Sequence, residues 1–195
     1  MSNANLMNEE MYLIVGLGNP EPEYSKTRHN VGFDAVNLIS QKYNIPFNKK
    51  GFDGIYGIGE IDGKKVILLK PQTYMNESGK SIIQVKNFYK IPIENIIIIH
   101  DEMDFDVGNV KLRKQGGAGT HNGMKSVVNE LKSKNFPRVR IGTGMPIFKD
   151  LMIDYVIKKL TDEEYEKLKE PIKTASEAAV SIVKDGIDLS MNKYN

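Results

Sequence analysis

The side chains best suited to chemistry in this sequence gather in a few short segments. The three histidines of the chain, and three of its asparagines, fall in segments that follow predicted strands: His29, His100, His121, Asn19, Asn76 and Asn122. In an open α/β sheet, ligands bind beyond the carboxyl ends of the strands. We therefore expect these segments to converge on one site.

An imidazole and a carboxylate in these segments could act together as a general base. A neutral imidazole can take a proton from water when a carboxylate orients it and stabilises the imidazolium. His29 and Asp101 are candidates for such a pair. The side-chain amides of Asn19, Asn76 and Asn122 could hold the water and polarise a carbonyl without titrating. Such a base suits an activated ester better than a peptide bond, whereas a single loop histidine is often ordinary surface.

Several common catalytic and cofactor motifs are absent or incomplete. Cysteine is missing, which excludes thiolate nucleophiles, disulfides and cysteine-ligated metals. The glycine pair at 16–18 lacks the third glycine of a dinucleotide-binding motif, because Glu21 takes its place, and the P-loop-like 79–81 has Tyr74 where glycine is required. The acidic cluster at 101–106 lacks calcium-loop spacing and is typical of a turn. We expect no metal and no cofactor.

Positive charge is concentrated in one part of a nearly neutral chain. The formal net charge is +2, yet residues 111–140 hold eight basic residues against one acidic residue, Glu130. The glycine-rich stretch 116–123 precedes a predicted helix, so its backbone N–H groups could face an anion. A solvated face and a flexible glycine hairpin are the alternatives. Phosphates could be held by the basic residues around this stretch: Lys111, Arg113, Lys114, Arg138 and Arg140.

The elements that must position these residues alternate between strands and helices. Apolar runs predict strands over Tyr12–Val15, Gly54–Ile61, Lys64–Lys70, Asn95–Ile99, Val110–Lys114 and Arg138–Ile141. Helical spacing predicts helices over Val31–Tyr43, Ser78–Tyr89 and Gly123–Leu131. This alternation predicts an α/β fold, a single globular domain with a mixed, mostly parallel central β-sheet flanked by helices on both faces.

Turn and capping residues mark further boundaries. Asp62-Gly63 between two apolar runs predicts a hairpin. Thr161 and Glu164 have the spacing of a capping box and open a C-terminal helix. Pro171 should kink or divide that helix before a last piece near Thr174–Lys184.

The chain ends and apolar runs suggest a single domain without membrane segments. Residues 1–10 are polar and unpatterned, include Ser2-Asn3-Ala4 that is typical of a cloning remnant, and are expected to be a disordered extension. Residues 11–195 should form the domain. No apolar run approaches the roughly 20 residues that a membrane helix needs, and no secretory leader opens the chain. We expect a cytoplasmic protein.

Five short motifs carry a resemblance over nearly the whole chain from about Tyr12. They are Gly-Leu-Gly-Asn-Pro at 16–20, Thr-Arg-His-Asn at 27–30, Thr-Tyr-Met-Asn at 73–76, His-Asp-Glu at 100–102 and His-Asn-Gly at 121–123. In this order and at these separations, the sequence resembles bacterial-type peptidyl-tRNA hydrolase.

The resemblance implies an enzyme that cleaves the ester between a peptide and tRNA, recycling tRNA from stalled translation. It places the general base at His29, its supporting carboxylate at Asp101 and the reader of the blocked amino end at Asn19. It implies substrate- and tRNA-binding positions at Tyr24, Tyr74, Met75, Asn76, His121, Asn122, Arg113 and Arg140. The last two would grip phosphates of the acceptor stem.

The resemblance also implies a monomer that needs no metal or cofactor and binds the acceptor stem and 3′ end of peptidyl-tRNA. A mobile cover segment would lie within 142–156. Glu21 and Thr120 stand where the family usually has glycine. A non-catalytic RNA-binding relative is the main alternative, but every base and amide position is present, which favours an enzyme. A nucleotide-dependent oxidoreductase would rest on the glycine pair alone.

Overall fold

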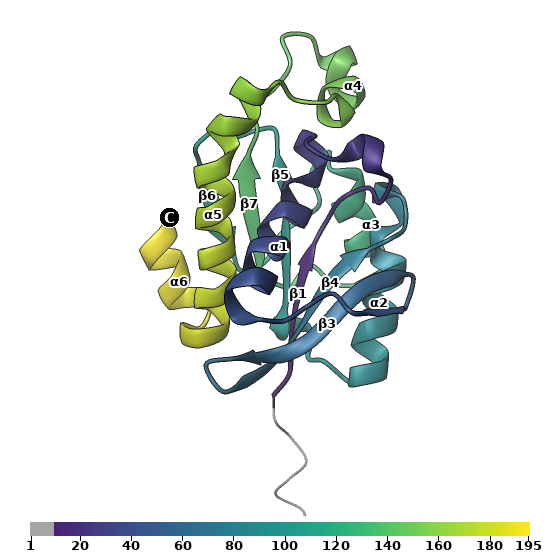
Figure 1. Cartoon of the computed structure of the whole chain (residues 1–195), viewed down its shortest axis with the longest axis vertical. Helices are drawn as coiled ribbons and strands as arrows, with labels where there is room; N and C mark the ends of the chain where they lie inside the picture. Colours follow the sequence, from purple (N-terminus) through teal and green to yellow (C-terminus); the bar gives the residue numbers. More distant parts are fainter. Residues whose placement is uncertain (1–9) are drawn as a thin grey trace, which may run out of the picture.

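A seven-stranded mixed sheet forms the centre of the computed structural model, which describes residues 10–195 (Figure 1). The strands run over Tyr12–Gly16 (β1), Lys49–Gly51 (β2), Gly54–Ile61 (β3), Lys64–Pro71 (β4), Ile96–Glu102 (β5), Val110–Arg113 (β6) and Arg138–Gly142 (β7). Their order is β2-β3-β4-β1-β5-β7-β6. The four central strands are parallel, and the outer pairings β2–β3, β3–β4 and β6–β7 are antiparallel.

Helices cover both faces of this sheet. The helices run over Val31–Tyr43 (α1), Ser78–Tyr89 (α2), Asn122–Leu131 (α3), Met152–Ile157 (α4), Asp162–Asp185 (α5) and Ile187–Tyr194 (α6). In the central strands, Ile14 and Ile97 pack in the core beneath α1 and α5, whereas Leu13 and Ile96 pack in the core beneath α2 and α3. The central strands are continuous apolar runs because both of their faces are buried.

The predicted α/β class, with a mixed sheet between two helix layers, is confirmed. The sheet is not mostly parallel as expected, because parallel pairings make up only three of the six found within residues 10–195 and are confined to its centre. The hairpin at Asp62-Gly63 is confirmed, with both residues at positive φ, as a tight primed turn requires. The capping box of Thr161 and Glu164 is confirmed as well.

Two predicted element boundaries are wrong. β5 extends through Glu102 because β7 pairs with it as far as Asp101 and Glu102, so His100 and Asp101 lie in the strand and not in the loop after it. α5 is one helix of 24 residues and is not divided at Pro171. Buried residues on both sides of the proline, Leu168 and Ile172, anchor the helix to the core and offset the one lost backbone hydrogen bond.

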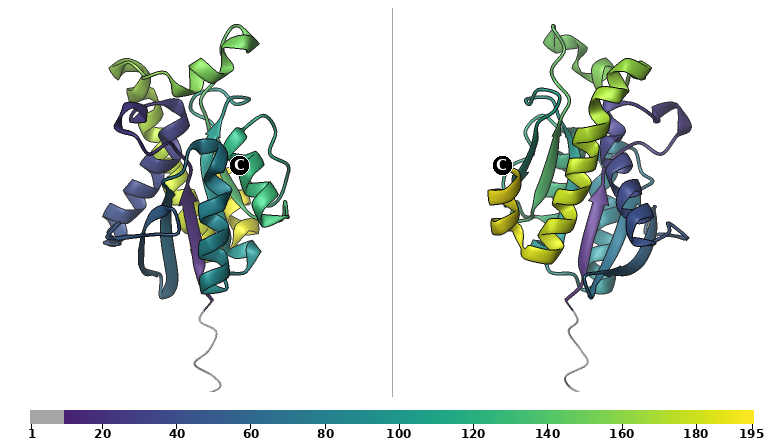
Figure 2. Two further views of the ribbon diagram at one scale, coloured as in Figure 1. Left: turned by 90° about the vertical axis from the view of Figure 1, so that its right-hand side faces the viewer. Right: turned by 60° about the vertical axis from the view of Figure 1, so that its left-hand side comes forward.

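Three short strands and helices were not predicted from the sequence: β2, α4 and α6. The strand has three residues and the two helices have six and eight, too short for a clear period. α4 lies beyond the carboxyl ends of the central strands, apart from both helix layers (Figure 2). It overlaps the segment 142–156, in which the family resemblance placed a mobile cover.

All elements from β1 to α6 belong to this one sheet and the helices around it. The expected extension over residues 1–10 lies outside the described residues, except for Glu10. Within residues 10–195, none of the helices combines the length and the apolar character needed to cross a bilayer.

Two glycines let α1 start directly against the sheet. A Cβ atom on Gly16 would collide with the carbonyl group of Gly32, and one on Gly32 would lie 2.5 Å from the carbonyl oxygen of Ile99. The first turn of α1 therefore sits tightly against β1 and β5. His29, three residues before Gly32, is held close to the ends of the same strands.

We expect Gly32→Ala to lower the free energy of unfolding by about 1–3 kcal/mol, because the added methyl group has no room in this contact. The matched control is Gly117→Ala, where a Cβ atom would meet nothing within 4 Å. Urea unfolding followed by circular dichroism measures both variants. Equal midpoints for the two would contradict the tight contact.

Candidate active site

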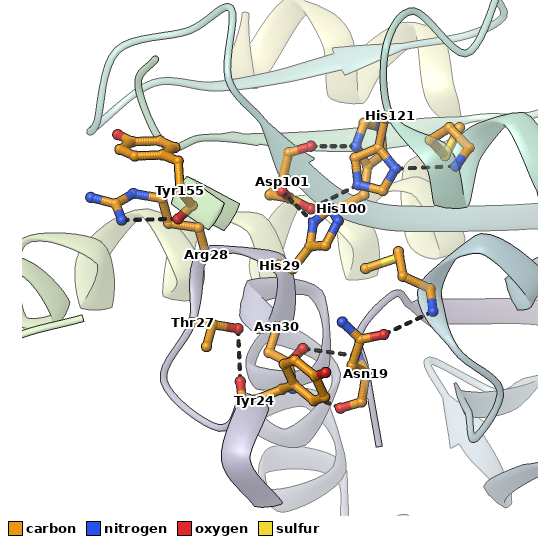
Figure 3. Close-up of polar contacts among 12 residues, drawn as sticks. Asn19, Tyr24, Thr27, Arg28, His29, Asn30, His100, Asp101, His121 and Tyr155 are labelled. Atoms are coloured by element: carbon orange, nitrogen blue, oxygen red, sulfur yellow. Dashed lines mark hydrogen bonds and ion pairs between the residues drawn. The ribbon is translucent and has the colours of Figure 1, made fainter. Parts of the chain in front are cut away.

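His29 and Asp101 meet at the carboxyl edge of the sheet (Figure 3). Asp101 lies near the end of β5 and is 1% exposed, and His29 lies in a one-turn 3-10 helix, η3 (Arg28–Asn30), just before α1. The His29 Nδ1 atom is 2.8 Å from Asp101 Oδ2. Because Nδ1 donates its proton to the carboxylate, Nε2 remains as the basic nitrogen.

A second imidazole, that of His121, binds the other oxygen of the same carboxylate. His121 is the N-cap of α3, and its Nδ1 accepts a hydrogen bond of 3.1 Å from the backbone N–H of Met124. The proton must therefore sit on Nε2, which donates to Asp101 Oδ1 at 2.8 Å. Each carboxylate oxygen thus receives one imidazole N–H.

Asp101, His29 and His121 form a cluster in which the charge of each group depends strongly on the others. Burial on its own would raise the pKa of Asp101, but the facing imidazoles of His29 and His121 hold that pKa well below its usual range. Burial opposes a charge on His29, yet the charge of Asp101 and their hydrogen bond outweigh it and raise the pKa of His29 above its ordinary value of 6.5. The arrangement makes His29 a stronger base than a free imidazole.

His100 supports the cluster from below and is not itself placed to act as a base. Its ring is 2% exposed and lies edge-on to the ring of His121, with centroids 4.9 Å apart. Its Nδ1 donates to the backbone carbonyl of Asp101 at 2.7 Å. Burial, together with His121, lowers the pKa of His100 to about 3, so the ring is neutral.

A pair of asparagines fixes the loop that follows β1. The backbone N–H of Asn19 donates to the side-chain oxygen of Asn30 at 2.9 Å, and the side-chain amide of Asn30 donates back to the carbonyl of Asn19 at 3.0 Å. The side-chain oxygen of Asn19 in turn accepts the backbone N–H of Met75 at 2.8 Å. These hydrogen bonds engage the backbone and the side-chain oxygen of Asn19, and they fix the orientation of its NH2 group.

Met75 connects these loops to the start of α3. It opens a second one-turn helix, η4 (Met75–Glu77), and a Cβ atom on Gly123 would lie 2.5 Å from its sulfur and 3.0 Å from the ring of His121. Through these contacts all five sequence motifs meet in one place. Asn76 and Asn122, the neighbours of Met75 and His121, are exposed at the starts of their helices.

A cavity of about 300 Å³ opens beside the pair. Part of its lining is polar: His29, Asp101, His121, Asn122 and Thr120. The lining also includes an apolar wall, formed by Met103 directly after β5 and by Met152, Ile153 and Val156 of α4, and the charged residues Glu102, Lys149 and Asp150. This apolar wall was not predicted from the sequence, although Met152, Ile153 and Val156 have the spacing of one helical turn.

Three arginines of the basic segment, Arg113, Arg138 and Arg140, line a second, smaller cavity. Arg113 and Arg140 line a space of about 150 Å³ together with His100 and Glu102, below the glycine-rich stretch. β6 runs antiparallel, so the loop after it begins at the far end of the sheet and crosses back to reach His121. The rule that ligands bind beyond the carboxyl ends of the strands therefore does not explain why this loop lies at the site. The loop reaches the site only because it crosses back along the sheet.

Arg138 differs from the other two arginines because its charged group is already occupied. It is 2% exposed, and its Nη atoms donate to the carbonyls of Gly117, Lys134 and Phe136. Burial and the charges of Arg113 and Arg140 lower its pKa to about 10. Arg138 therefore holds the glycine-rich loop, and the expectation that it binds phosphate is not favoured.

Two further predicted residues, Tyr24 and Tyr74, do not line the cavity that contains His29. Tyr24 is half-buried, and Tyr74 is 59% exposed. Glu21 and Tyr74 line an open groove of about 720 Å³. Another groove, about 740 Å³ between α1 and α5, contains none of the predicted site residues.

The cluster at the carboxyl edge of the sheet also offers a possible set of metal ligands. His29, Asp101 and His121 offer ligand atoms within 4.8 Å of one another. Zinc accepts such ligands, but both imidazole nitrogens that face the carboxylate are engaged in N–H···O bonds of 2.8 Å. A cation at this position would have to displace both protons.

Comparison with known proteins identifies close relatives. A sequence model of the family described as peptidyl-tRNA hydrolase matches residues 13–195. The chain is 50% identical over 185 residues to a peptidyl-tRNA hydrolase of Clostridium botulinum, covering 95% of this chain and 97% of the relative. A peptidyl-tRNA hydrolase of Clostridium acetobutylicum is also 50% identical over 185 residues, with 95% and 98% covered.

Solved structures show the same fold. A crystal structure of peptidyl-tRNA hydrolase from Acinetobacter baumannii superimposes with a TM-score of 0.89 at 40% identity, covering 95% of this chain and 94% of that one. A complex of peptidyl-tRNA hydrolase with N-propanol gives a TM-score of 0.90 at 40% identity, covering 96% and 95%.

We expect Asp101→Asn to lower the pKa of His29 below 6.5, because burial of the ring persists while the carboxylate charge that raises the pKa is removed. Titration of the His29 Cε1–H resonance by NMR measures the pKa in both proteins. In the wild type the unprotonated base forms only as the pH rises through a pKa above 6.5. An unchanged pKa in the variant would show that Asp101 does not control His29.

Proposed function

The chain belongs to the peptidyl-tRNA hydrolase family, and we propose that His29 and Asp101 carry out its reaction. The protein is an enzyme that hydrolyses peptidyl-tRNA, releasing the peptide from the tRNA. The observation that carries the residue assignment is the 2.8 Å hydrogen bond between His29 Nδ1 and the buried carboxylate of Asp101.

In the proposed mechanism, His29 activates water for attack on the ester carbonyl. Its Nε2 takes a proton from the water as the oxygen bonds to the carbonyl carbon, and the negative charge of Asp101 stabilises the imidazolium. The imidazolium then returns the proton to the ribose oxygen as the ester C–O bond breaks. The products are a peptide carboxylic acid and tRNA with a free hydroxyl group, and His29 is neutral again.

Side-chain amides are proposed to hold the reacting groups. Asn122 lines the same cavity as His29 and can donate its NH2 to the developing oxyanion or to the attacking water. The NH2 group of Asn19, whose oxygen is fixed by Met75, is suited to a carbonyl oxygen at the blocked amino end of the peptide. Asn76, exposed beside Met75, together with Tyr24 and Tyr74, would contact the remainder of the peptide or the 3′ end.

The tRNA itself is proposed to bind through the arginines. Arg113 is exposed and Arg140 is partly exposed at the small cavity beneath the glycine-rich loop, where a phosphate of the acceptor stem could bind both guanidinium groups. We propose that the enzyme acts as a monomer, as the resemblance to the family implies. A cytoplasmic location is proposed from its substrate, which arises in translation.

We expect His29→Ala to reduce turnover by a factor on the order of 10²–10⁴, because the general base is lost. Binding of tRNA should remain close to that of the wild type, since His29 does not line the cavity that Arg113 and Arg140 line. Release of an N-acetylated amino acid from tRNA measures turnover, and filter binding measures affinity. Lys26→Ala, in the same loop, is the matched control and should keep its turnover. Equal turnover for His29→Ala and Lys26→Ala would refute the assignment of the base.

Arg113→Ala and Arg140→Ala should each weaken tRNA binding and reduce the slope of log affinity against log salt concentration by about 1. The reason is that each guanidinium displaces counterions from one phosphate. Affinities measured at several salt concentrations give the slope. Lys167→Ala, an exposed position on α5, serves as the control and should leave the slope unchanged. If the arginine variants behave like the control, the phosphates are bound elsewhere.

A further inference from the structure

The residue next to the proposed base makes an unusually close contact with the cover segment. The guanidinium carbon of Arg28 lies 3.7 Å from the centroid of the Tyr155 ring on α4 (Figure 3). Its Nη1 donates to the backbone carbonyl of Tyr155 at 3.3 Å. The Arg28 side chain is only 11% exposed. Arg28 therefore binds both the ring and the backbone of a single residue of α4.

Tyr155 is tied to the sheet through its other end. Its hydroxyl group donates to the backbone carbonyl of Thr143 at 2.9 Å, at the point where the chain leaves β7. A weaker contact joins Arg28 to the N-terminal cap of α5, with Nη2 3.7 Å from Glu164 Oε1. The loop before η3 also pairs with the segment after α4, since the N–H of Leu160 donates to the carbonyl of Lys26 at 2.9 Å.

These contacts set the distance between His29 and the apolar wall of the cavity. Met152, Ile153 and Val156 lie on the same short helix as Tyr155 and face the cavity that contains His29. Arg28 and His29 are consecutive residues of η3. A movement of α4 away from Arg28 would therefore widen the space between this wall and the base.

Several apolar side chains of the cover segment are exposed and contribute little packing. Ile147 is 94% exposed, Phe148 is 64% exposed and Ile153 is 70% exposed. Of the residues of α4, only Val156 is buried. The stacked arginine is thus a major fixed contact for a helix that contributes few buried side chains of its own.

We propose that Arg28 is a positioning residue that fixes the apolar wall of α4 against the side chain of the amino acid esterified to tRNA. The proposal rests on the function assigned above, because it needs the ester carbonyl to lie at His29. The cavity, about 300 Å³ with thioether and aliphatic side chains in its lining, suits an apolar side chain of medium size. Arg28 would act on selectivity through the wall, without touching the substrate.

The first test follows the cover segment directly, without substrate. The chain contains no tryptophan, so Ile147→Trp introduces a single indole on the exposed part of the segment. Time-resolved fluorescence anisotropy of this indole should show an added fast component when Arg28→Ala is combined with it. Tyr155→Leu removes the ring beneath the guanidinium and should have the same effect, whereas Tyr155→Phe keeps that ring, loses only the hydrogen bond to Thr143 and should have a smaller effect. Lys26→Ala is the matched control and should leave the decay unchanged.

The second test measures selectivity with one tRNA acylated with either N-acetyl-leucine or N-acetyl-glycine. For Arg28→Ala we expect kcat/KM to fall about tenfold on the leucine substrate, mainly through a higher KM, and to change less than about twofold on the glycine substrate. Arg28→Lys keeps the charge but loses the flat stacking surface and should resemble Arg28→Ala.

The outcomes separate this proposal from the assigned function. Equal losses on the two substrates, or an indole as rigid in Arg28→Ala as in Lys26→Ala, would overturn the positioning role. A failure of the assigned function would be seen in the wild type, as absence of hydrolysis of both substrates. The NMR pKa of His29 should be the same in Arg28→Ala and the wild type, and a shifted pKa would mean that Arg28 acts on the base and not on the wall.

Discussion

The buried carboxylate of Asp101 is the constraint on which the site depends. A charge with 1% exposure is costly unless it is paired, and removal of a partner leaves an uncompensated ion that costs several kcal/mol. Both of its oxygens are satisfied by imidazole N–H groups, one from η3 and one from the cap of α3. The carboxylate thus fixes the orientation of His29 and joins segments from both faces of the sheet.

The three side chains of the one-turn helix η3 point in three different directions. His29 turns inward to Asp101, Asn30 exchanges hydrogen bonds with Asn19, and Arg28 turns outward to Tyr155 on α4. The same 3-10 turn therefore positions the proposed base His29, the loop that contains Asn19 and the cover segment. The close glycine contact between α1 and β1 holds this turn in place, so that small backbone changes there would be transmitted to all three.

Much of this arrangement could be predicted from sequence where the signal was local. The apolar runs of β1, β4 and β5, the Asp62-Gly63 turn and the Thr161 capping box each depend on neighbouring residues, and each was found. The pairing of His29 with Asp101 was inferred from strand ends and from family likeness. What could not be predicted depends on contacts between distant segments. The extension of β5 requires β7, the continuity of α5 through Pro171 requires the core, and the stack of Arg28 on Tyr155 joins residues 127 positions apart.

The central claim is that one carboxylate selects opposite tautomers in two histidines. The most direct measurement is the ¹⁵N chemical shifts of the ring nitrogens of His29 and His121, recorded above the pKa of His29. The structure predicts a proton on Nδ1 in His29 and on Nε2 in His121, with both N–H groups directed at Asp101. A His29 ring protonated on Nε2 would contradict this account, because the nitrogen assigned to take the proton from water would already carry one.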